Sequence, residues 1–246
     1  MISFFRNKKT ALTNIIPNGF VDIHAHLLPG IDDGAKSMEE TMALIKTMRS
    51  YGIKKFIATP HVMEGVWENT PAIIQQKLTA TNNCLKEEGL YDVTIGAAAE
   101  YMLDAHFEQL LKEKQLLTLK DNIVLVELSY QSAPLNLYDL LFKIQVAGYK
   151  PLLAHPERYS FFHNNYKEYQ KLKAVGCLFQ LNLLSLSNYY GRYVQQIAIK
   201  LLKDAMFDFV GTDTHHLRHL DFLKKITDKK TLKLVTPLLQ KNSFFS

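Results

Sequence analysis

Cysteine is scarce in this sequence, and the two that occur, Cys84 and Cys177, lie far apart and form no CxxC pair. A disulfide framework and a cysteine-ligated zinc site are therefore not expected, and a reducing compartment, the cytoplasm, is the default. Neither cysteine is followed by an arginine at the sixth position. This excludes the arrangement in which a cysteine thiolate attacks a phosphate held by an arginine loop.

Long apolar runs are also missing, so no segment is expected to span a bilayer. The first ten residues, MISFFRNKKT, carry charge but no apolar core of the kind that a secretory signal has. We treat residues 1–18 as a basic N-terminal tail. Its side chains could contact a membrane surface or a partner, although a frayed tail is the simpler interpretation; they are Phe4, Phe5, Arg6, Lys8 and Lys9.

Several nucleotide and hydrolase motifs are absent as well. There is no GxxxxGK[ST], no GxGxxG linked to a strand and no GxSxG. The sequence has no Pro/Gly/Ser-rich linker, low-complexity run or internal repeat. Its net charge is +5, from 29 Lys and Arg against 24 Asp and Glu. This mild excess suits an anionic ligand, but no basic stretch interleaved with aromatic residues indicates nucleic-acid binding.

What is present is an alternation of short apolar runs with segments of helical periodicity. Strand-type runs are expected at 20–23, 53–59, 92–99, 123–126, 151–154, 177–181 and 207–210, which makes about seven. Helices are expected at 38–48, 71–88, 104–114, 137–146, 165–175 and 194–203, with two more after residue 216. In a chain of 246 residues, this pattern predicts one α/β domain with a parallel sheet, either open or closed into a barrel.

The stretch GFVDIHAHLLPGIDDG, residues 19–34, holds the first candidate site residues. His24 and His26 are two positions apart at the end of a predicted strand, so their side chains share one face. Together with Asp22, two neutral imidazoles there can chelate a divalent metal. Taken alone, the two histidines could instead be ordinary surface residues.

Residues of ligand type recur at six predicted strand ends. In parallel α/β folds this edge carries the active site, and closure into a barrel would bring them around one axis. Such a density of carboxylates and imidazoles needs cations between them, and their number suggests two or three ions. The mixed nitrogen and oxygen set favours manganese, iron or zinc. The candidates are His24, His26, His61, Glu100, Glu127, His155, Asp213 and His215.

A centre with several metals performs hydrolysis by lowering the pKa of bound water and holding the oxygens of the transferred group. Arg158 suits a bidentate clamp on phosphate, or else an ion pair with Glu157 or another carboxylate. Asp33 suits a general acid, or else a turn-capping residue before a glycine. Asn182 could orient a phosphate oxygen or cap its loop.

The motifs DIHAH, GIDDG, TPH, AAE, VEL, AHPER and GTDTH, in this order, resemble the PHP superfamily (polymerase and histidinol phosphatase). The pairing of HAHLLPGIDDG with AHPERY most resembles the bacterial capsule-type tyrosine phosphatases of the CpsB/CapC kind. The likeness runs from Phe20 to His215. The loop after His61, VMEGVW, departs from the basic residues that Gram-positive members carry there.

The resemblance implies a single-domain distorted (β/α)7 barrel over residues 19–246, with the active site at the carboxyl ends of the strands. It implies two to three divalent ions, usually manganese, with iron, zinc or magnesium as alternatives. The eight candidates above are then the metal ligands, while Asp33 and Arg158 act on the phosphate. The implied substrate is phosphotyrosine on the tail of a membrane tyrosine autokinase that controls capsular or exopolysaccharide production.

Two other functions stay open at this point. One is a small-molecule phosphomonoesterase on the same fold, such as a histidinol-phosphate phosphatase. The other is a non-catalytic metal-binding module that docks through its basic N-terminus. Trp67 or Tyr101 could stack on the phenyl ring of a substrate, although core packing is the simpler role for either.

Overall fold

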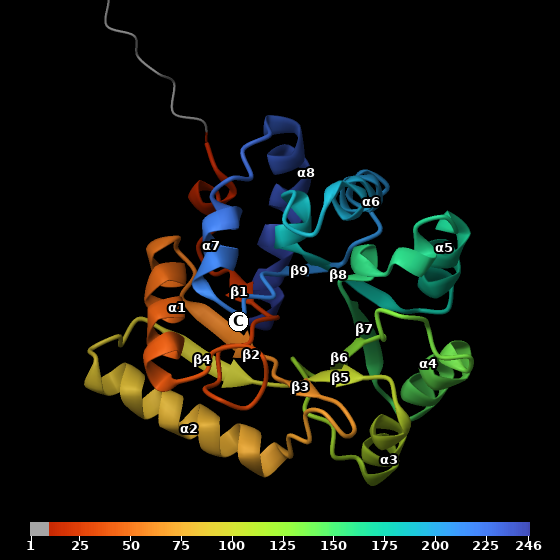
Figure 1. The fold of residues 1–246 in the computed structure, drawn as a ribbon, viewed down its shortest axis with the longest axis horizontal. Helices are drawn as coiled ribbons and strands as arrows, with labels where there is room; N and C mark the ends of the chain where they lie inside the picture. Colours follow the sequence, from red (N-terminus) through yellow and green to blue (C-terminus); the bar gives the residue numbers. More distant parts are fainter. Residues whose placement is uncertain (1–9) are drawn as a thin grey trace, which may run out of the picture.

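The computed structural model describes residues 10–246, and the side chains predicted to contact a membrane or partner lie outside this range. Within it, helices and strands alternate along the chain (Figure 1). The strands are β1 (Val21–Asp22), β2 (Lys55–Ala58), β3 (His61–Val62), β4 (Thr94–Ala97), β5 (Glu100–Met102), β6 (Ile123–Glu127), β7 (Lys150–Ala154), β8 (Leu178–Asn182) and β9 (Phe209–Gly211). The α-helices are α1 (Met38–Ser50), α2 (Pro71–Glu87), α3 (Ala105–Glu113), α4 (Leu137–Val146), α5 (Tyr166–Ala174), α6 (Arg192–Lys203), α7 (Leu217–Leu223) and α8 (Lys229–Lys241).

The strands form two sheets, and every paired strand is parallel to its neighbour. One sheet has the order β1-β2-β4, and the other has the order β3-β5-β6-β7-β8-β9. The alternating pattern therefore predicted the fold class correctly: a mixed α/β domain with parallel strands. Helices lie around the outside of the strands in Figure 1.

The expected number of strands, about seven, differs from the nine in residues 10–246. Two predicted strands, 53–59 and 92–99, each end early, and a second short strand follows in the other sheet. Pro60 lies at the first break and has no N–H to donate to a ladder, so pairing stops there and resumes at His61. The segment between β4 and β5 runs alongside this break, because Ala98 N–H donates to Ala58 O at 2.9 Å and Glu100 N–H donates to Pro60 O at 3.0 Å.

The first and last strands approach each other just beyond their carboxyl ends. Ala25 and Thr214 form an isolated parallel bridge. His26 N–H donates to Thr214 O at 3.0 Å, and Asp213 N–H donates to His24 O at 2.7 Å. Two segments far apart in sequence, each carrying candidate ligands, are thus fixed beside one another by backbone hydrogen bonds.

Helix starts follow the expected capping chemistry. The Ser37 hydroxyl accepts from Glu40 N–H at the start of α1, and Thr70 and Asp104 cap α2 and α3 in the same way. Ser37 and Glu40 have the spacing of a capping box, but only half of it forms, because the Glu40 carboxylate accepts from Lys36 N–H instead of the Ser37 N–H. Beneath the helices, a core of Leu, Ile, Val and Phe side chains supports the strands.

Ordered packing begins before residue 19. Leu12, in the short 3₁₀-helix Leu12–Asn14, is buried, and its N–H donates to Ile226 O at 2.9 Å. Residues 10–18 therefore contact the body of the domain, whereas the predicted role of the basic residues before them stays a prediction.

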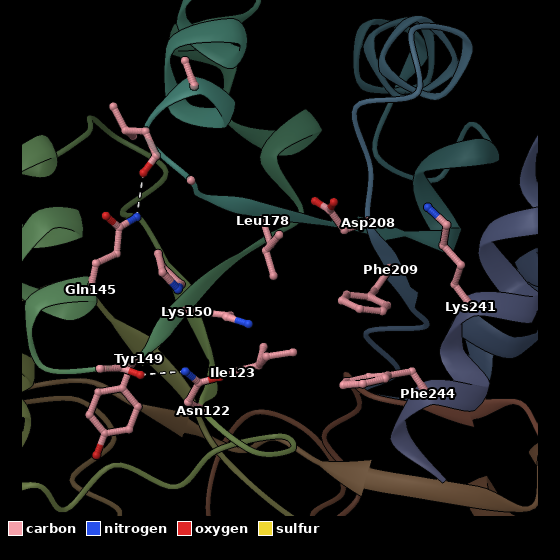
Figure 2. Close-up of a pocket in the computed structure, with 15 residues that line it drawn as sticks. Asn122, Ile123, Gln145, Tyr149, Lys150, Leu178, Asp208, Phe209, Lys241 and Phe244 are labelled. Atoms are coloured by element: carbon pink, nitrogen blue, oxygen red, sulfur yellow. Dashed lines mark hydrogen bonds between the residues drawn. The ribbon is translucent and has the colours of Figure 1, made fainter.

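The amino ends of β6 to β9 surround an open hollow of about 930 Å³, shown in Figure 2. Its lining includes Lys150, Lys241 and the stacked rings of Phe209 and Phe244, whose centroids are 6.0 Å apart. None of the predicted site residues lines it. The predicted metal ligands lie away from it, at or just beyond the carboxyl ends of β1, β2, β4, β6, β7 and β9.

Candidate metal centre

The structure brings all eight predicted ligands together. Four groups of side chains have ligand atoms within 4.8 Å of one another, and the groups overlap. They are His26, Asp33, His61 and His215; His24, His26 and Asp213; His24, Glu100 and His155; and His61, Glu100 and Glu127. Residues from six separate strand ends form one compact cluster. This gathering was expected, because each candidate follows a predicted strand.

Glu100 lies at the middle of the cluster. Its Oε2 atom is 3.1 Å from His24 Nε2 and 3.2 Å from His61 Nδ1, and its Oε1 atom is 3.0 Å from His155 Nε2. The side chain is fully buried. Because one carboxylate belongs to two of the four groups, its two oxygens could serve two different cations.

Asp213 also lies between two of the candidate histidines. Its Oδ1 atom is 3.4 Å from both His24 Nε2 and His26 Nε2. The backbone of Asp213 has φ 50°, and that of His155 has φ 34°. This left-handed conformation is unfavourable for residues with a Cβ atom and is found most often at functional sites.

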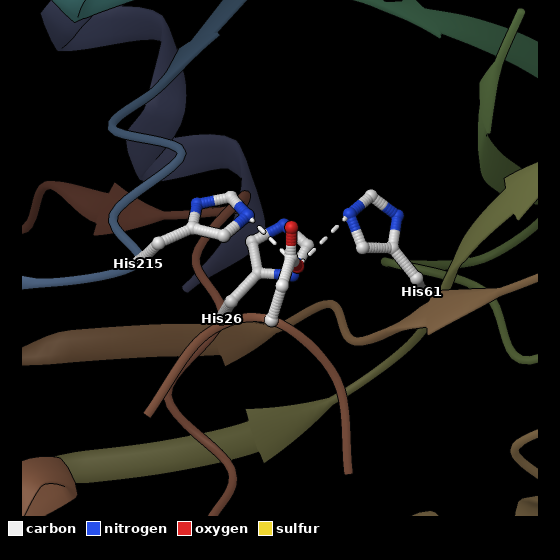
Figure 3. A group of neighbouring side chains, drawn as sticks. His26, His61 and His215 are labelled. Atoms are coloured by element: carbon white, nitrogen blue, oxygen red, sulfur yellow. Dashed lines mark ion pairs between the residues drawn. The ribbon is translucent and has the colours of Figure 1, made fainter. Parts of the chain in front are cut away.

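Asp33 completes the group nearest to solvent. Its side chain is 54% exposed, and Oδ1 lies 3.3 Å from His215 Nε2 and 3.5 Å from His61 Nε2. Figure 3 shows the rings of His26, His61 and His215 converging on one point. Burial of Asp33 opposes ionisation, but the hydrogen bond and charge of His215 outweigh it and lower the pKa of this carboxyl below its usual value.

Within residues 10–246, three buried polar atoms of the cluster have no hydrogen-bond partner: His61 Nδ1, Glu100 Oε2 and Glu127 Oε1. His61 Nδ1 lies 2.8 Å from Glu127 Oε1, yet the alignment is not that of a hydrogen bond. Buried polar atoms are normally satisfied, and leaving them unpaired costs about 1–3 kcal/mol each. An oxygen- and nitrogen-binding cation among these atoms would satisfy them, so the residues present fit metal ions.

Two residues that the sequence did not single out orient the histidines. Gln180 Oε1 lies 2.8 Å from His24 Nδ1, and Asp32 Oδ2 lies 2.8 Å from His26 Nδ1. Both contacts hold the outer ring nitrogen and leave Nε2 facing the cluster, which is the usual support of a metal-bound histidine. A glutamine inside the apolar run of 177–181 was the available signal for the first.

The charges of the cluster balance one another. Burial disfavours ionisation of Glu100, but the charges of His24 and His61 prevail and hold its pKa well below the usual range. Burial likewise opposes protonation of His26, while the charge of Asp32 keeps its pKa well above the usual value. In Glu127 burial dominates, and with the charge of Glu100 it raises the pKa. Bound cations would neutralise the carboxylates in place of the protons that the histidines carry here.

Asp22 is a correction to the sequence prediction. Its carboxylate does not join any of the four groups but accepts from the Thr212 N–H at 3.0 Å and from the Thr212 hydroxyl at 2.6 Å. Burial raises its pKa to about 6, despite these hydrogen bonds. This carboxylate therefore links the end of β1 to the residue that follows β9.

Arg158 lies at the edge of the cluster between two tyrosine rings. Its guanidinium carbon is 4.8 Å from the Tyr130 centroid and 4.1 Å from the Tyr190 centroid. Nη1 donates to Asp213 Oδ2 at 2.7 Å. The predicted alternative of an ion pair is therefore present, with Asp213 and not with Glu157. Glu157 is buried and accepts from Asn182 N–H instead.

Asn182 performs the capping role considered for it and a second role. Its Oδ1 accepts from Leu184 N–H at 2.9 Å, which caps the following 3₁₀-helix. Its Nδ2 donates to Asp213 Oδ2 at 2.8 Å. The amide therefore holds the same carboxylate oxygen that Arg158 contacts.

Of the two aromatic residues considered for substrate stacking, Tyr101 is a core residue. It is buried, packs against Phe107, and its hydroxyl accepts from Leu117 N–H at 2.7 Å. Trp67 is half-buried, and its backbone pairs with Met63 in both directions at 2.9 Å. Its role at a substrate stays a prediction.

The comparisons with known proteins agree with this geometry. A family model described as "Capsular polysaccharide synthesis, CpsB/CapC" matches residues 20–232. The chain belongs to the CpsB/CapC family. It is 30% identical over 203 residues to the tyrosine-protein phosphatase YwqE of Bacillus subtilis, covering 82% of this chain and 80% of that protein. It is also 30% identical to the tyrosine-protein phosphatase CpsB of Streptococcus pneumoniae, covering 80% of this chain and 83% of that protein.

A solved structure extends the CpsB/CapC likeness to three dimensions. It is described as one of YwqE from Bacillus subtilis and CpsB from Streptococcus pneumoniae, "unique metal-dependent tyrosine phosphatases". The superposition has a TM-score of 0.82 at 28% sequence identity and covers 91% of this chain and 92% of that one. In residues 10–246 of this CpsB/CapC member, no helix is long and apolar enough to cross a membrane.

Gly211 offers a test of how tightly this CpsB/CapC centre is packed. A Cβ atom at this position would lie 2.5 Å from His24 Cβ and 2.9 Å from Gln180 Nε2. We expect Gly211→Ala to push the His24 ring away from Glu100 and to lower the free energy of unfolding by about 1–3 kcal/mol. Chemical denaturation measures this loss. Gly96→Ala is the matched control, because a Cβ there meets nothing within 4 Å, and equal effects of the two changes would contradict the expectation.

Proposed function

We propose that this chain is a metal-dependent protein-tyrosine phosphatase. The observation that carries the proposal is the overlap of four candidate ligand groups in one cluster, with Arg158 and Asp33 at its rim. A pocket of about 260 Å³ opens between these two side chains and is also lined by Tyr189, Tyr190 and His215. A cation centre, an arginine and a half-exposed carboxylate are together the parts that phosphate ester hydrolysis needs.

The eight predicted ligands are proposed to hold two or three divalent ions, with manganese as the first choice. Such ions, when bound, activate water at neutral pH and neutralise charge on phosphate oxygens. Gln180 and Asp32 fix the His24 and His26 rings toward that site from outside. The unpaired buried atoms of His61, Glu100 and Glu127 support this assignment.

Arg158 is proposed to bind the non-bridging oxygens of the phosphate. A guanidinium matches two such oxygens with two parallel N–H groups. One of its nitrogens is occupied by Asp213, and the rings of Tyr130 and Tyr190 hold its plane from both sides. The side chain is therefore already oriented before substrate arrives, which limits the entropy lost on binding.

Asp33 is proposed to protonate the leaving phenolate oxygen. It is the carboxyl group of the cluster that reaches solvent, and it lies in the same pocket as Arg158. A substrate that displaces Asp33 from His215 would remove the contacts that lower its pKa. The carboxyl could then carry the proton to the oxygen at which the ester bond breaks.

The architecture is proposed to be a distorted (β/α)7 barrel. Seven strand positions follow around one axis when β2 with β3 and β4 with β5 are each counted as one bent strand. The hydrogen bonds from Ala98 and Glu100 across the break and the bridge between Ala25 and Thr214 support this reading. The description would place the ligand cluster at the top of the barrel.

The physiological substrate is proposed to be phosphotyrosine on the cytoplasmic tail of a membrane tyrosine autokinase that controls capsular or exopolysaccharide production. Support comes from the capsular polysaccharide description of the matched family. Two relatives are tyrosine-protein phosphatases by name. The enzyme would then act in the cytoplasm.

Release of phosphate from a tyrosine-phosphorylated peptide tests the proposal. The purified chain is loaded with manganese and compared with a chelator-treated sample. Turnover that is lost on chelation and restored by manganese supports it. Bound metal without turnover of phosphotyrosine, but with turnover of histidinol phosphate, would replace it by a small-molecule phosphatase; bound metal with neither would leave a non-catalytic module.

Asp33→Asn separates the role of Asp33 as an acid from a role as a ligand. We expect turnover of phenyl phosphate, which has a poor leaving group, to fall on the order of 100-fold, as for loss of a general acid. Turnover of 4-nitrophenyl phosphate should fall far less, because its leaving group needs little protonation. Steady-state kinetics on the two esters measures the difference. A uniform loss on both esters, accompanied by loss of bound metal, would show that Asp33 is a ligand.

A further inference from the structure

A second pocket lies beside the cluster and is separated from the pocket of Asp33 and Arg158 by the contact between Arg158 and Tyr130. It has a volume of about 640 Å³ and is lined by Met63, Glu64, Met102, Asp104, Ser129, Tyr130 and Gln131. Its walls come from the segments that leave β3, β5 and β6. It shares Tyr130 with the metal centre, since the Tyr130 ring stacks on His155 at 5.9 Å and on the Arg158 guanidinium at 4.8 Å.

The position of this pocket follows from strand periodicity. Met63, Met102 and Ser129 are each two residues beyond a predicted ligand, namely His61, Glu100 and Glu127. On an extended chain, residues two apart point to the same side. The pocket therefore continues the open side of the cluster outward along three strands, where a polypeptide attached to a bound phosphotyrosine would lie.

The two sides of the cluster differ in charge. The pocket on the β3–β5–β6 side has two carboxylates, Glu64 and Asp104, and within the described residues no lysine or arginine lines it. Glu64 is exposed, and its backbone N–H donates to Asp104 Oδ2 at 3.0 Å, so the backbone at Glu64 is fixed beside the Asp104 carboxylate. The pocket that contains Arg158 is lined by one carboxylate, Asp33, and by three histidines, and Arg218 is exposed close to His216 in sequence.

Methionine walls are the second feature of this pocket. Met63 and Met102 are both half-exposed. Methionine side chains are flexible and polarizable and adapt to the apolar stems of different side chains. A lysine or arginine suits such a pocket well, because its methylene stem packs on apolar surface while its charged end reaches a carboxylate.

We propose that this pocket reads the sequence around the phosphotyrosine and selects a basic residue on one flank. The inference rests on the proposed tyrosine phosphatase function and deepens it. Glu64 is the specificity-determining residue, with Met63 and Met102 contacting the stem of the bound side chain. The histidine-rich side of the cluster accepts the other flank of the substrate, and that flank tolerates acidic residues.

Four phosphotyrosine peptides test the proposal, with either lysine or glutamate placed on the amino or the carboxyl flank. On one of the two flanks, kcat/KM should be about two- to fivefold higher for lysine than for glutamate, the range of an exposed ion pair. Glu64→Lys should remove or reverse this preference. Glu87→Lys, which makes the same charge change at the exposed end of α2, should leave the preference intact.

Turnover of phenyl phosphate, which has no flanks, is the internal reference and should be equal in the parent chain and in both variants. Equal kcat/KM for all four peptides would overturn this inference alone, as would a lysine preference that persists in Glu64→Lys. A chain that hydrolyses neither phenyl phosphate nor any peptide would overturn the proposed function, and this inference with it.

Discussion

Replacing Glu100 by glutamine is expected to lower phosphotyrosine turnover on the order of 1,000-fold, the scale on which loss of one key electrostatic group acts. Glu100 lies within 3.0–3.2 Å of His24, His61 and His155 and belongs to two of the four ligand groups. An amide keeps the volume of the side chain but offers one neutral oxygen in place of two anionic ones. We therefore expect the variant to bind more than one of the ions less tightly.

Steady-state kinetics together with elemental analysis of bound metal measures the effect of Glu100→Gln. Glu113→Gln, on the exposed end of α3, is the control and should behave like the parent chain. Far-UV circular dichroism checks that the helices are retained in both variants. A Glu100→Gln protein that keeps its full metal content and more than a tenth of its activity would show that Glu100 is not a ligand.

Removal of divalent ions is expected to abolish turnover and to lower thermal stability at the same time. A ligand present at 1,000 times its Kd stabilises the folded state by about 4 kcal/mol. For a domain of this size, this corresponds to a fall in Tm of roughly 8–16 °C. The physical reason is that chelation leaves the buried Glu100, Glu127 and Asp213 without the cations proposed to lie between them.

Differential scanning fluorimetry with and without a chelator measures this shift, and manganese added back should reverse it. Glu100→Gln is the informative comparison. Because this variant should bind fewer ions, its Tm should fall less on chelation than that of the parent chain. A parent chain whose Tm and activity are both unchanged by exhaustive chelation would contradict the assignment of the whole cluster as a metal centre.

The gathering of the candidate ligands could be predicted because its signal is local. Each candidate follows a short apolar run, and in a parallel sheet the ends of such runs meet at one edge. His61, Glu100 and His155 were found in this way, without knowledge of which strands are neighbours. The same rule failed for Asp22, whose partner Thr212 is 190 residues away and is reached only because β1 and β9 lie side by side.

The supporting contacts could not be predicted for the same reason. Gln180 reaches His24 across 156 residues of sequence, and Tyr130 and Tyr190 enclose Arg158 from two different loops. No periodicity places a loop tyrosine over an arginine. The breaks between β2 and β3 and between β4 and β5 were equally hidden, although Pro60 was a visible signal for the first of them.

The sharing of ligands among the four groups has a consequence for how the centre fills. A cation held by His24, Glu100 and His155 would share Glu100 with the group that contains His61 and Glu127. The two positions would then not fill independently, because the shared carboxylate links them while the repulsion between two neighbouring divalent ions opposes the second binding step. Loss of one ion would also disturb the carboxylate that holds the other. Metal content and activity would therefore fall together when the metal supply is limiting.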